Sequence, residues 1–229
     1  MGRNKIREFE IDNVYQEHCG DLSAELSEQI DLIYADIIYD AWEEVPIEAL
    51  VCTLKPGGAL FLQTDYRSIA QAKLTLDKLL MFNNWIIWPY DWGGRPKDAF
   101  GRKHDDILYY IKPGTKHTFN AEAVSVKKTV MIRSTKDWKI PTDVWADIGN
   151  FYTTSKERIR QNGRSIAWQK PEALIERIIL VASNRGDIIF EPYLGTGTAC
   201  AVAKRLGRHF VGCDIRSDMV KIAKKRLNL

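Results

Sequence analysis

The chain has 229 residues, of which 45% are hydrophobic and 28% are charged, and its formal net charge is +3. This length suits one α/β domain with a complete core, and the composition is that of an ordinary globular protein. No apolar run is long enough to span a membrane, and no apolar segment of a secretory signal follows the polar first residues, so we expect a cytoplasmic protein.

Strand-like and helix-like segments alternate through the first half of the chain. Short apolar runs predict strands at residues 30–35, 59–63, 85–88 and 107–111. Apolar residues at helical spacing predict helices at 45–54 and 68–81, and Lys55-Pro56-Gly57-Gly58 predicts a turn. The segment from Gly114 to Arg164 is polar and irregular.

Regular structure resumes at Pro171, which is a favourable first residue of a helix. The next strand is expected to start at Gly186 and to end at Glu191. The last helix is expected to begin at Ser217, with this serine as its cap. The repeated β–α–β order predicts an α/β fold with a mostly parallel sheet that helices cover on both faces.

Four cysteines are scattered along the chain: Cys19, Cys52, Cys200 and Cys213. Because they form neither a CxxC pair nor a cluster with histidines, reduced buried thiols are favoured over metal ligands or disulfides. We therefore expect no metal site.

Charge is segregated along the sequence. Residues 21–50 contain nine acidic and no basic side chains, whereas residues 94–139 contain eleven Lys or Arg and five acids. A further basic run, in residues 151–170, consists of Lys156, Arg158, Arg160, Arg164 and Lys170. These segments indicate either a phosphate-binding surface or an ordinary solvated face.

A glycine-spaced loop follows the strand predicted before Glu191. The sequence from Ile189 to Thr198 runs from an apolar strand through an acid into Gly195-Thr196-Gly197 and then a helix. Asp214 ends the next apolar run, and Asp36 ends the first predicted strand. Ligands of parallel sheets bind at the carboxyl ends of the strands, so we expect these acids to line one nucleotide-cofactor site. Taken alone, Asp36 is equally typical of a strand-end turn.

Several motifs recur in a characteristic order. They are Gly20-Asp21-Leu22, Asp31 to Asp36, Leu54 to Gly58, Asp143 to Ile148, Glu157-Arg158, Gln169 to Glu172, Gly186 to Thr198, Leu206 to Arg208 and Gly212 to Ile215. This series closely resembles the S-adenosylmethionine-dependent amino-group DNA methyltransferases, in the permuted order whose catalytic motif precedes the cofactor loop. The resemblance covers nearly the whole chain. It implies a Rossmann-like methyltransferase fold with a mostly parallel seven-stranded sheet, as a single domain over residues 1–229.

The same resemblance implies S-adenosylmethionine as the cofactor and double-stranded DNA as the partner, as in restriction-modification systems. Gly195 and Gly197 would let the backbone approach the methionine part of the cofactor. Glu191, where many family members carry Asp, would lie near its ammonium, and Asp214 would bind the ribose hydroxyls. The other implied cofactor-binding residues are Asp21 and Leu22 near the adenine ring, Lys170 and Pro171 at the methionine end, and Asp36, Pro192, Tyr193 and Thr198. For Asp21, a simple turn acid is an equal alternative.

The catalytic motif departs from the family pattern. Relatives carry Asp-Pro-Pro-Tyr or Asp-Pro-Pro-Phe, whereas this chain has Asp36-Ile37-Ile38-Tyr39. In the family, the carboxylate and the carbonyl of the next residue accept the two hydrogens of an exocyclic amine, and the aromatic ring stacks on a flipped base. Asp36, the Ile37 carbonyl and Tyr39 are the catalytic candidates. Losing both prolines removes the restraint on φ and adds N–H groups that need partners.

Two interpretations of the whole chain stay open. The first is an active enzyme that methylates N6 of adenine in DNA; Asp at the first motif position favours adenine over N4 of cytosine, which stays an alternative. The second is a degenerate homologue that binds cofactor or DNA without turnover. A DNA-binding accessory protein and an RNA or small-molecule methyltransferase are further alternatives. The chain has no Pro-Cys pair, which argues against C5-cytosine chemistry.

The basic insert at residues 94–164 is the candidate target-recognition region. Its predicted phosphate contacts are Arg95, Lys97, Arg102, Lys103 and His104, and the candidates for stacking or wedging are Trp92, Phe100 and Trp138. The insert is small for the family. A short target, relaxed specificity and a homodimer are all consistent with that size.

Overall fold

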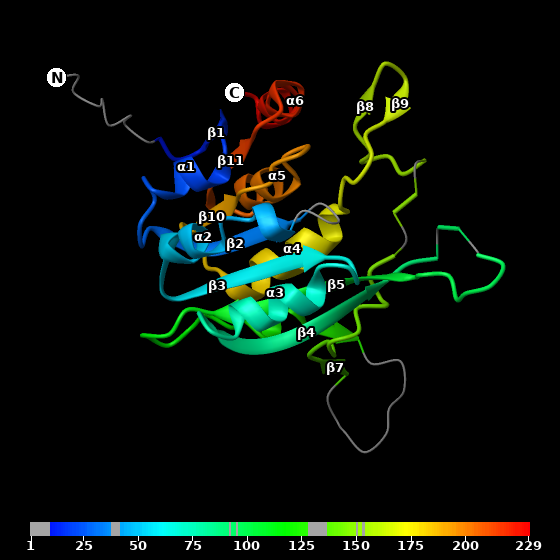
Figure 1. Cartoon of the computed structure of the whole chain (residues 1–229), viewed down its shortest axis with the longest axis horizontal. Coiled ribbons are helices and arrows are strands. Elements are labelled where there is room, and N and C mark those ends of the chain that lie inside the picture. Colours follow the sequence, from blue (N-terminus) through cyan, green and yellow to red (C-terminus); the bar gives the residue numbers. More distant parts are fainter. Residues whose placement is uncertain are drawn as a thin grey trace.

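The centre of the molecule is a seven-stranded sheet with the order β1-β11-β10-β2-β3-β5-β4, seen in a computed structural model (Figure 1). Its strands are β1 (Asn13–Gln16), β2 (Ile30–Asp36), β3 (Leu54–Thr64), β4 (Met81–Pro89), β5 (His104–Ile111), β10 (Ile188–Glu191) and β11 (His209–Asp214). β5 is antiparallel to both of its neighbours, and the other adjacent pairs are parallel. The predicted fold class and the mostly parallel, seven-stranded sheet are confirmed.

The structure describes residues 10–37, 42–91, 93–94, 96–127, 137–149, 151–152 and 154–229. Four residues singled out from the sequence lie outside this part of the chain: Ile38, Tyr39, Trp92 and Arg95. No helix among the described residues is both long and apolar enough to cross a bilayer. The same residues contain no cluster of three His, Cys, Asp or Glu side chains that could hold a metal ion.

Helices cover both faces of the sheet, as predicted. One face is packed by α4 (Glu172–Ala182), α5 (Thr198–Arg205) and α6 (Ser217–Leu227), and the other by α1 (Cys19–Ser23), α2 (Ile47–Thr53) and α3 (Ile69–Leu76). Strand side chains alternate between the two cores; Leu32 and Tyr34 of β2 point to the first, and Ile33 and Ala35 to the second. Burial of both faces explains why these strands are apolar almost throughout.

The turn predicted at Lys55 to Gly58 lies inside β3 instead of before it. Ile30 pairs with Leu54 but Leu32 pairs with Ala59, so the residues between form an irregularity in the strand. Gly57 occupies it with φ of 80°, and its N–H donates to the carbonyl of Lys112 at 2.8 Å. These glycines read as a turn because a local pattern cannot show that the chain continues the same strand beyond them.

Other predicted boundaries are wrong by a few residues. The helix predicted for 68–81 ends at Leu76, and Met81 already begins β4. β10 starts at Ile188, because Gly186, with φ of 86°, belongs to the preceding turn. Pro171 and Arg216 are the N-cap residues of α4 and α6, so Pro171 precedes the helix, and Ser217 does not cap α6 with its side chain.

The region between β5 and α4 is irregular, as predicted. Its short elements are η2 (Glu122–Val124), β6 (Val126–Lys127), β7 (Trp138–Lys139), β8 (Arg160–Gln161) and β9 (Arg164–Ser165); η1 (Trp42–Glu44) precedes α2. The range 94–164 also contains β5, which belongs to the central sheet, so it is not a continuous insert. Among the cysteines, Cys52 is exposed instead of buried, and all four are free.

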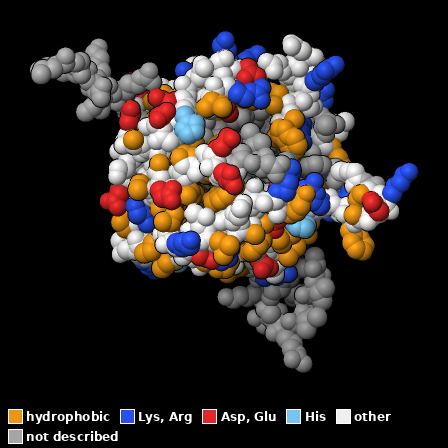
Figure 2. All heavy atoms as spheres, in the orientation of Figure 1, with side chains coloured by type: hydrophobic (Ala, Val, Ile, Leu, Met, Phe, Trp, Pro, Cys, Tyr) orange, Lys and Arg blue, Asp and Glu red, His pale blue; other side chains and the backbone are white. Residues whose placement is uncertain are grey.

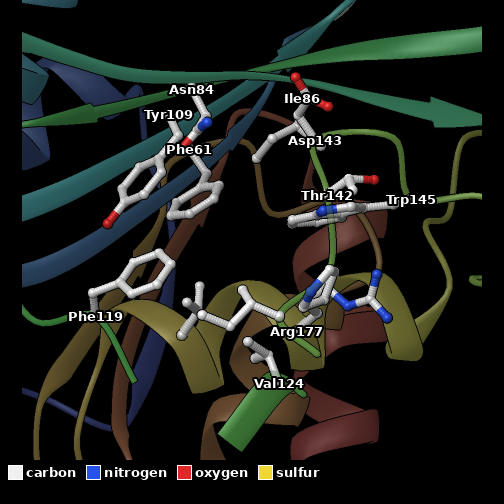
Figure 3. A pocket seen from close by; sticks show the side chains of 13 residues that line it. Phe61, Asn84, Ile86, Tyr109, Phe119, Val124, Thr142, Asp143, Trp145 and Arg177 are labelled. Atoms are coloured by element: carbon white, nitrogen blue, oxygen red, sulfur yellow. The ribbon is translucent and has the colours of Figure 1, made fainter. Parts of the chain in front are cut away.

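A small cavity of about 70 Å³ lies beneath the face covered by α4 (Figure 3). The stacked rings of Phe61 and Tyr109, 4.2 Å apart, form one wall, and Trp145 and Arg177 lie on the opposite side. Its lining residues do not include Asp36, Glu191 or Asp214, and Phe61 precedes the end of β3 by three residues, roughly 10 Å at 3.3 Å per residue. The cavity therefore does not form part of the site described next.

Candidate active site

The loop after β10 is held by the acid that precedes it. Both carboxylate oxygens of Glu191 accept backbone hydrogen bonds at the start of α5, from Ala199 at 3.0 Å and from Cys200 at 2.9 Å. Glu191 is only 4% exposed, and burial raises its pKa to about 7 despite these two donors. The side chain thus folds the loop onto the helix N-terminus, where the helix dipole favours an acid.

Asp214 holds the same loop from the neighbouring strand. One oxygen accepts from the N–H of Gly195 and the other from the N–H of Arg216, each at 2.9 Å. β11 lies directly beside β10, so the two acids flank the loop at the carboxyl ends of adjacent strands. A carboxylate can accept about four hydrogen bonds, so half-buried Asp214 keeps capacity for a ligand hydroxyl.

The two glycines of the loop face different surroundings. Gly195 has φ of 48°, and a Cβ at this position would meet no atom within 4 Å. Gly197 has φ of 69° and is the N-cap of α5, and a Cβ there would lie 3.0 Å from the Cβ of Ala223 on α6. Gly195 therefore borders open space, whereas Gly197 permits close packing of the loop on a helix.

α1 lies against the start of this loop. The Cys19 thiol lies beside the Tyr193 hydroxyl, so the first residue of α1 neighbours the segment after β10. Leu22 is 2% exposed and packs in the core, whereas Asp21 is exposed. The structure thus brings the two predicted adenine-end residues near the loop but gives Leu22 a packing role.

Asp36 ends β2, which is the other neighbour of β10. Its Oδ1 lies 3.1 Å from Nζ of Lys170, and the same ammonium lies 3.2 Å from Oδ2 of Asp105 at the start of β5. Burial raises the pKa of Asp36 to about 6; Lys170 opposes this rise and Asp105 adds to it. Lys170, predicted at the methionine end of a cofactor, therefore contacts the catalytic candidate directly.

Sequence reasoning missed the polar network around this ion pair. Asp105 is 2% exposed and also accepts from Nε2 of Gln63 at 2.8 Å and from the Tyr90 hydroxyl at 3.3 Å. Gln63 in turn accepts from the Tyr34 hydroxyl at 2.7 Å. The available signal was an acid and an amide at core-facing positions of apolar strands, since buried polar groups need partners.

The backbone at Ile37 continues the strand ladder. Its N–H donates to the carbonyl of Gln63 at 2.9 Å, and its side chain is 2% exposed in the core. The N–H that proline would lack is thus paired, and strand pairing restrains the backbone where relatives use a ring.

The side chains predicted to contact DNA differ in their exposure and in their partners within the protein. Lys97 is exposed on the β4–β5 loop, which projects from the body of the molecule (Figure 1). Arg102 instead pairs with Asp65 at 3.0 Å and stacks over Tyr66. Lys103 donates to the carbonyl of Asp91, and exposed His104 begins β5.

The basic run at residues 156–170 is not one surface. Arg158 donates to four backbone carbonyls of its own segment, and Lys170 is buried beside Asp36. Arg160 and Arg164 are exposed on the β8–β9 hairpin. Figure 2 shows Lys and Arg side chains on this hairpin and on the tip of the projecting loop, on the side of the molecule where β3 ends.

Comparison with known proteins identifies the family. Residues 25–225 match the N6_N4_Mtase family model, described as DNA methylase. The chain belongs to this family.

The chain matches different shares of the individual relatives. The chain is 32% identical to the DNA adenine methyltransferase YhdJ of Escherichia coli K12 over 92% of this chain and 81% of that protein. It is 35% identical to the type II methyltransferase M.HpaI of Haemophilus parainfluenzae over 80% of this chain, but it spans only 57% of M.HpaI. The crystal structure of the M1.HpyAVI-SAM complex matches with a TM-score of 0.67 and 20% identity, covering 95% of this chain and 99% of that one, and it supports the fold alone.

Proposed function

We propose that this chain is an active S-adenosylmethionine-dependent DNA methyltransferase that methylates N6 of adenine. The observation that carries the proposal is the placement of Asp36. It ends the strand beside β10, so the amine-accepting candidate lies next to the loop flanked by Glu191 and Asp214. Family membership supplies the reaction class, and the site supplies the groups that the reaction needs.

The loop fits S-adenosylmethionine, which supplies a methyl group on a positively charged sulfur. Open space beside Gly195 leaves room for close approach of a ligand, and Asp214 has acceptor capacity for ribose hydroxyls. The carboxylates at these strand ends favour a cationic ligand over a phosphate. Glu191 is committed to the start of α5, so we assign it to loop shape instead of a direct contact with the ammonium.

Asp36 and Ile37 perform the amine recognition in this proposal. Lys170 contacts Oδ1 of Asp36, and Oδ2 has no partner among the described residues, so it can accept one hydrogen of an exocyclic amine. The Ile37 carbonyl accepts the second hydrogen, in a position fixed by the strand bond of its own N–H. These two acceptors orient the nitrogen lone pair towards the methyl donor, and positioning of this kind supplies much of the rate enhancement.

Adenine is the base that we propose. The Asp at the first motif position favours it, and the relative YhdJ is named a DNA adenine methyltransferase. N4 of cytosine is the second candidate, because the matching family includes both amine positions in its name. We assign DNA contact to the projecting β4–β5 loop, with Lys97, and to the β8–β9 hairpin, and Tyr39 to stacking on the flipped base.

The proposal is tested by incubating the chain with S-adenosylmethionine carrying a labelled methyl group and with unmethylated DNA, then digesting the DNA and identifying the labelled nucleoside. N6-methyl-2′-deoxyadenosine is expected, and Asp36→Asn is expected to abolish it while retaining cofactor binding. Label in N4-methyl-2′-deoxycytidine would show that cytosine is the target base. Cofactor binding with no transfer to any DNA would support the degenerate alternative.

A further inference from the structure

Three charged side chains meet beneath the proposed amine site. Lys170 lies between Asp36 and Asp105, with its ammonium 3.1 Å from one carboxylate and 3.2 Å from the other. Lys170 is 9% exposed and Asp105 is 2% exposed. One ammonium therefore serves two carboxylates in a site where water screens them little.

Asp105 is fixed by more than this ion pair. Gln63 of β3 and Tyr90, just after β4, both donate to it, while Lys170 approaches from the segment before α4. The carboxylate position is thus set by three separate parts of the fold. A group held in this way can impose one orientation on the lysine that it binds.

We infer that Asp105 and Lys170 are positioning residues for Asp36: Asp105 anchors the ammonium of Lys170, and Lys170 holds Asp36 ionised with one oxygen directed towards the amine. The inference rests on the proposed function, in which Asp36 accepts the amine hydrogen. A protonated Asp36 would present a hydroxyl in place of an acceptor, so its charge state decides whether the amine is bound productively.

The two partners act on Asp36 with opposite signs. The Lys170 ammonium stabilises the ionised carboxylate, whereas the nearby Asp105 carboxylate opposes ionisation. The other groups that face this network are the hydroxyls of Tyr34 and Tyr90 and the Gln63 amide, which carry no charge at neutral pH. Replacing each partner in turn therefore predicts shifts in opposite directions, which a merely structural role would not produce.

The experiment follows the titration of Asp36 by carbon-13 NMR of labelled aspartate carboxyl groups, with Asp36→Asn used to assign the signal. Lys170→Met is expected to raise the titration midpoint by about one to three pH units, and Asp105→Asn to lower it. Lys170→Arg keeps the charge and is expected to stay near the wild-type midpoint. The acid limb of kcat for methyl transfer should move with the midpoint in each variant.

Lys55→Met is the matched control, because Lys55 of β3 pairs at 2.7 Å with Asp31, which lies at the other end of β2 from Asp36. It is expected to leave the Asp36 midpoint unchanged. Shifts in the same direction for Lys170→Met and Asp105→Asn, or no shift in either, would overturn the inference. If Lys170→Met fails to fold, the inference is tested by the predicted fall of the Asp36 titration midpoint in Asp105→Asn. A wild type that transfers no methyl group would refute the proposed function, whereas the carboxyl titration would still test the pair.

Discussion

Ile37 lies at the position where the catalytic motif departs from the family, and the strand bond of its N–H predicts that restoring a proline there is harmful. Ile37→Pro removes the N–H that bonds to Gln63 and leaves a buried carbonyl unpaired, at a cost of about 1–3 kcal/mol. We expect the variant to have a lower free energy of unfolding in urea and a lower rate of methyl transfer than the wild type.

Ile37→Val is the control, because it keeps the N–H and the branched shape and is expected to cost about 0.5–1.5 kcal/mol. A faster rate in Ile37→Pro than in the wild type would show that strand pairing does not replace the ring.

Glu191 is expected to give the protein an unusual pH dependence. Its pKa is about 7 in the folded chain and 4.5 in the reference state, so the folded state binds this proton more tightly. Raising the pH from about 4.5 to 7 therefore lowers the stability of the wild type relative to Glu191→Gln. The free energy of unfolding of the wild type, minus that of Glu191→Gln, should fall by about 1–3 kcal/mol across this interval, because one pKa unit corresponds to about 1.4 kcal/mol.

The measurement is urea unfolding of both proteins at a series of pH values. A difference that grows with pH instead would mean that the two backbone donors and the helix dipole outweigh burial, so that the folded pKa lies below 4.5.

At the scale of single residues, the sequence revealed the acids but not their partners. Asp36, Glu191 and Asp214 each end an apolar run, and strand ends are visible locally. Asp105 and Gln63 join the site only because β5 pairs with β3, between residues more than 40 positions apart in the chain. No local pattern encodes such a pairing, so the network below Asp36 could not be predicted.

At the scale of elements, helix ends were the least predictable feature. Apolar spacing continues beyond Leu76 through Leu79 and Leu80, which suggested a longer α3. The helix nevertheless ends, and Asp77 just after it accepts hydrogen bonds from Lys73 and from Tyr110 of β5. Leu80 reaches the core from the turn before β4. Tertiary contacts of this kind override a helical period.

The contact between the glycine loop and α6 predicts that two similar substitutions will have different consequences. Gly195→Ala adds a methyl group to open space, so strain at positive φ costs about 1–2 kcal/mol and the main expected loss is in cofactor affinity. Gly197→Ala adds the same strain and also pushes against Ala223, so its expected loss is mainly in stability. Urea unfolding and calorimetric titration with S-adenosylmethionine separate the two effects.

Gly186→Ala is the matched control for this pair. Gly186 also has positive φ and open space around it, but it lies in the turn before β10, at the other end of that strand. The Gly186→Ala variant should lose as much stability as Gly195→Ala, and its affinity for the cofactor should stay unchanged. Equal affinities in Gly195→Ala and Gly186→Ala would exclude Gly195 from the cofactor site.

At the scale of the whole molecule, the two basic projections lie on the same side as Asp36. The β4–β5 loop and the β8–β9 hairpin both project on the side where β3 ends, which is also the side of Asp36 (Figure 1). Among the described acidic residues of the segment 21–50, Asp21 lies in α1 and Glu48 in α2, whereas Asp31 and Asp36 lie near the two ends of β2. The sequence showed this segregation of charge, but only the fold places the two basic projections on the same side.

If these projections bind DNA, removing one charge from each should weaken binding through phosphate contacts. The double variant Lys97→Gln/Arg164→Gln is expected to reduce affinity and to lower the magnitude of the slope of log K against log salt by about 2, since each lost contact contributes about 0.9. Lys78→Gln/Lys116→Gln removes the same charge from exposed residues, after α3 and after β5, at the other end of the sheet. Fluorescence anisotropy at several salt concentrations measures both slopes. Equal slopes in the two double variants would mean that net charge alone governs binding, and DNA contact would then have to be sought on another surface.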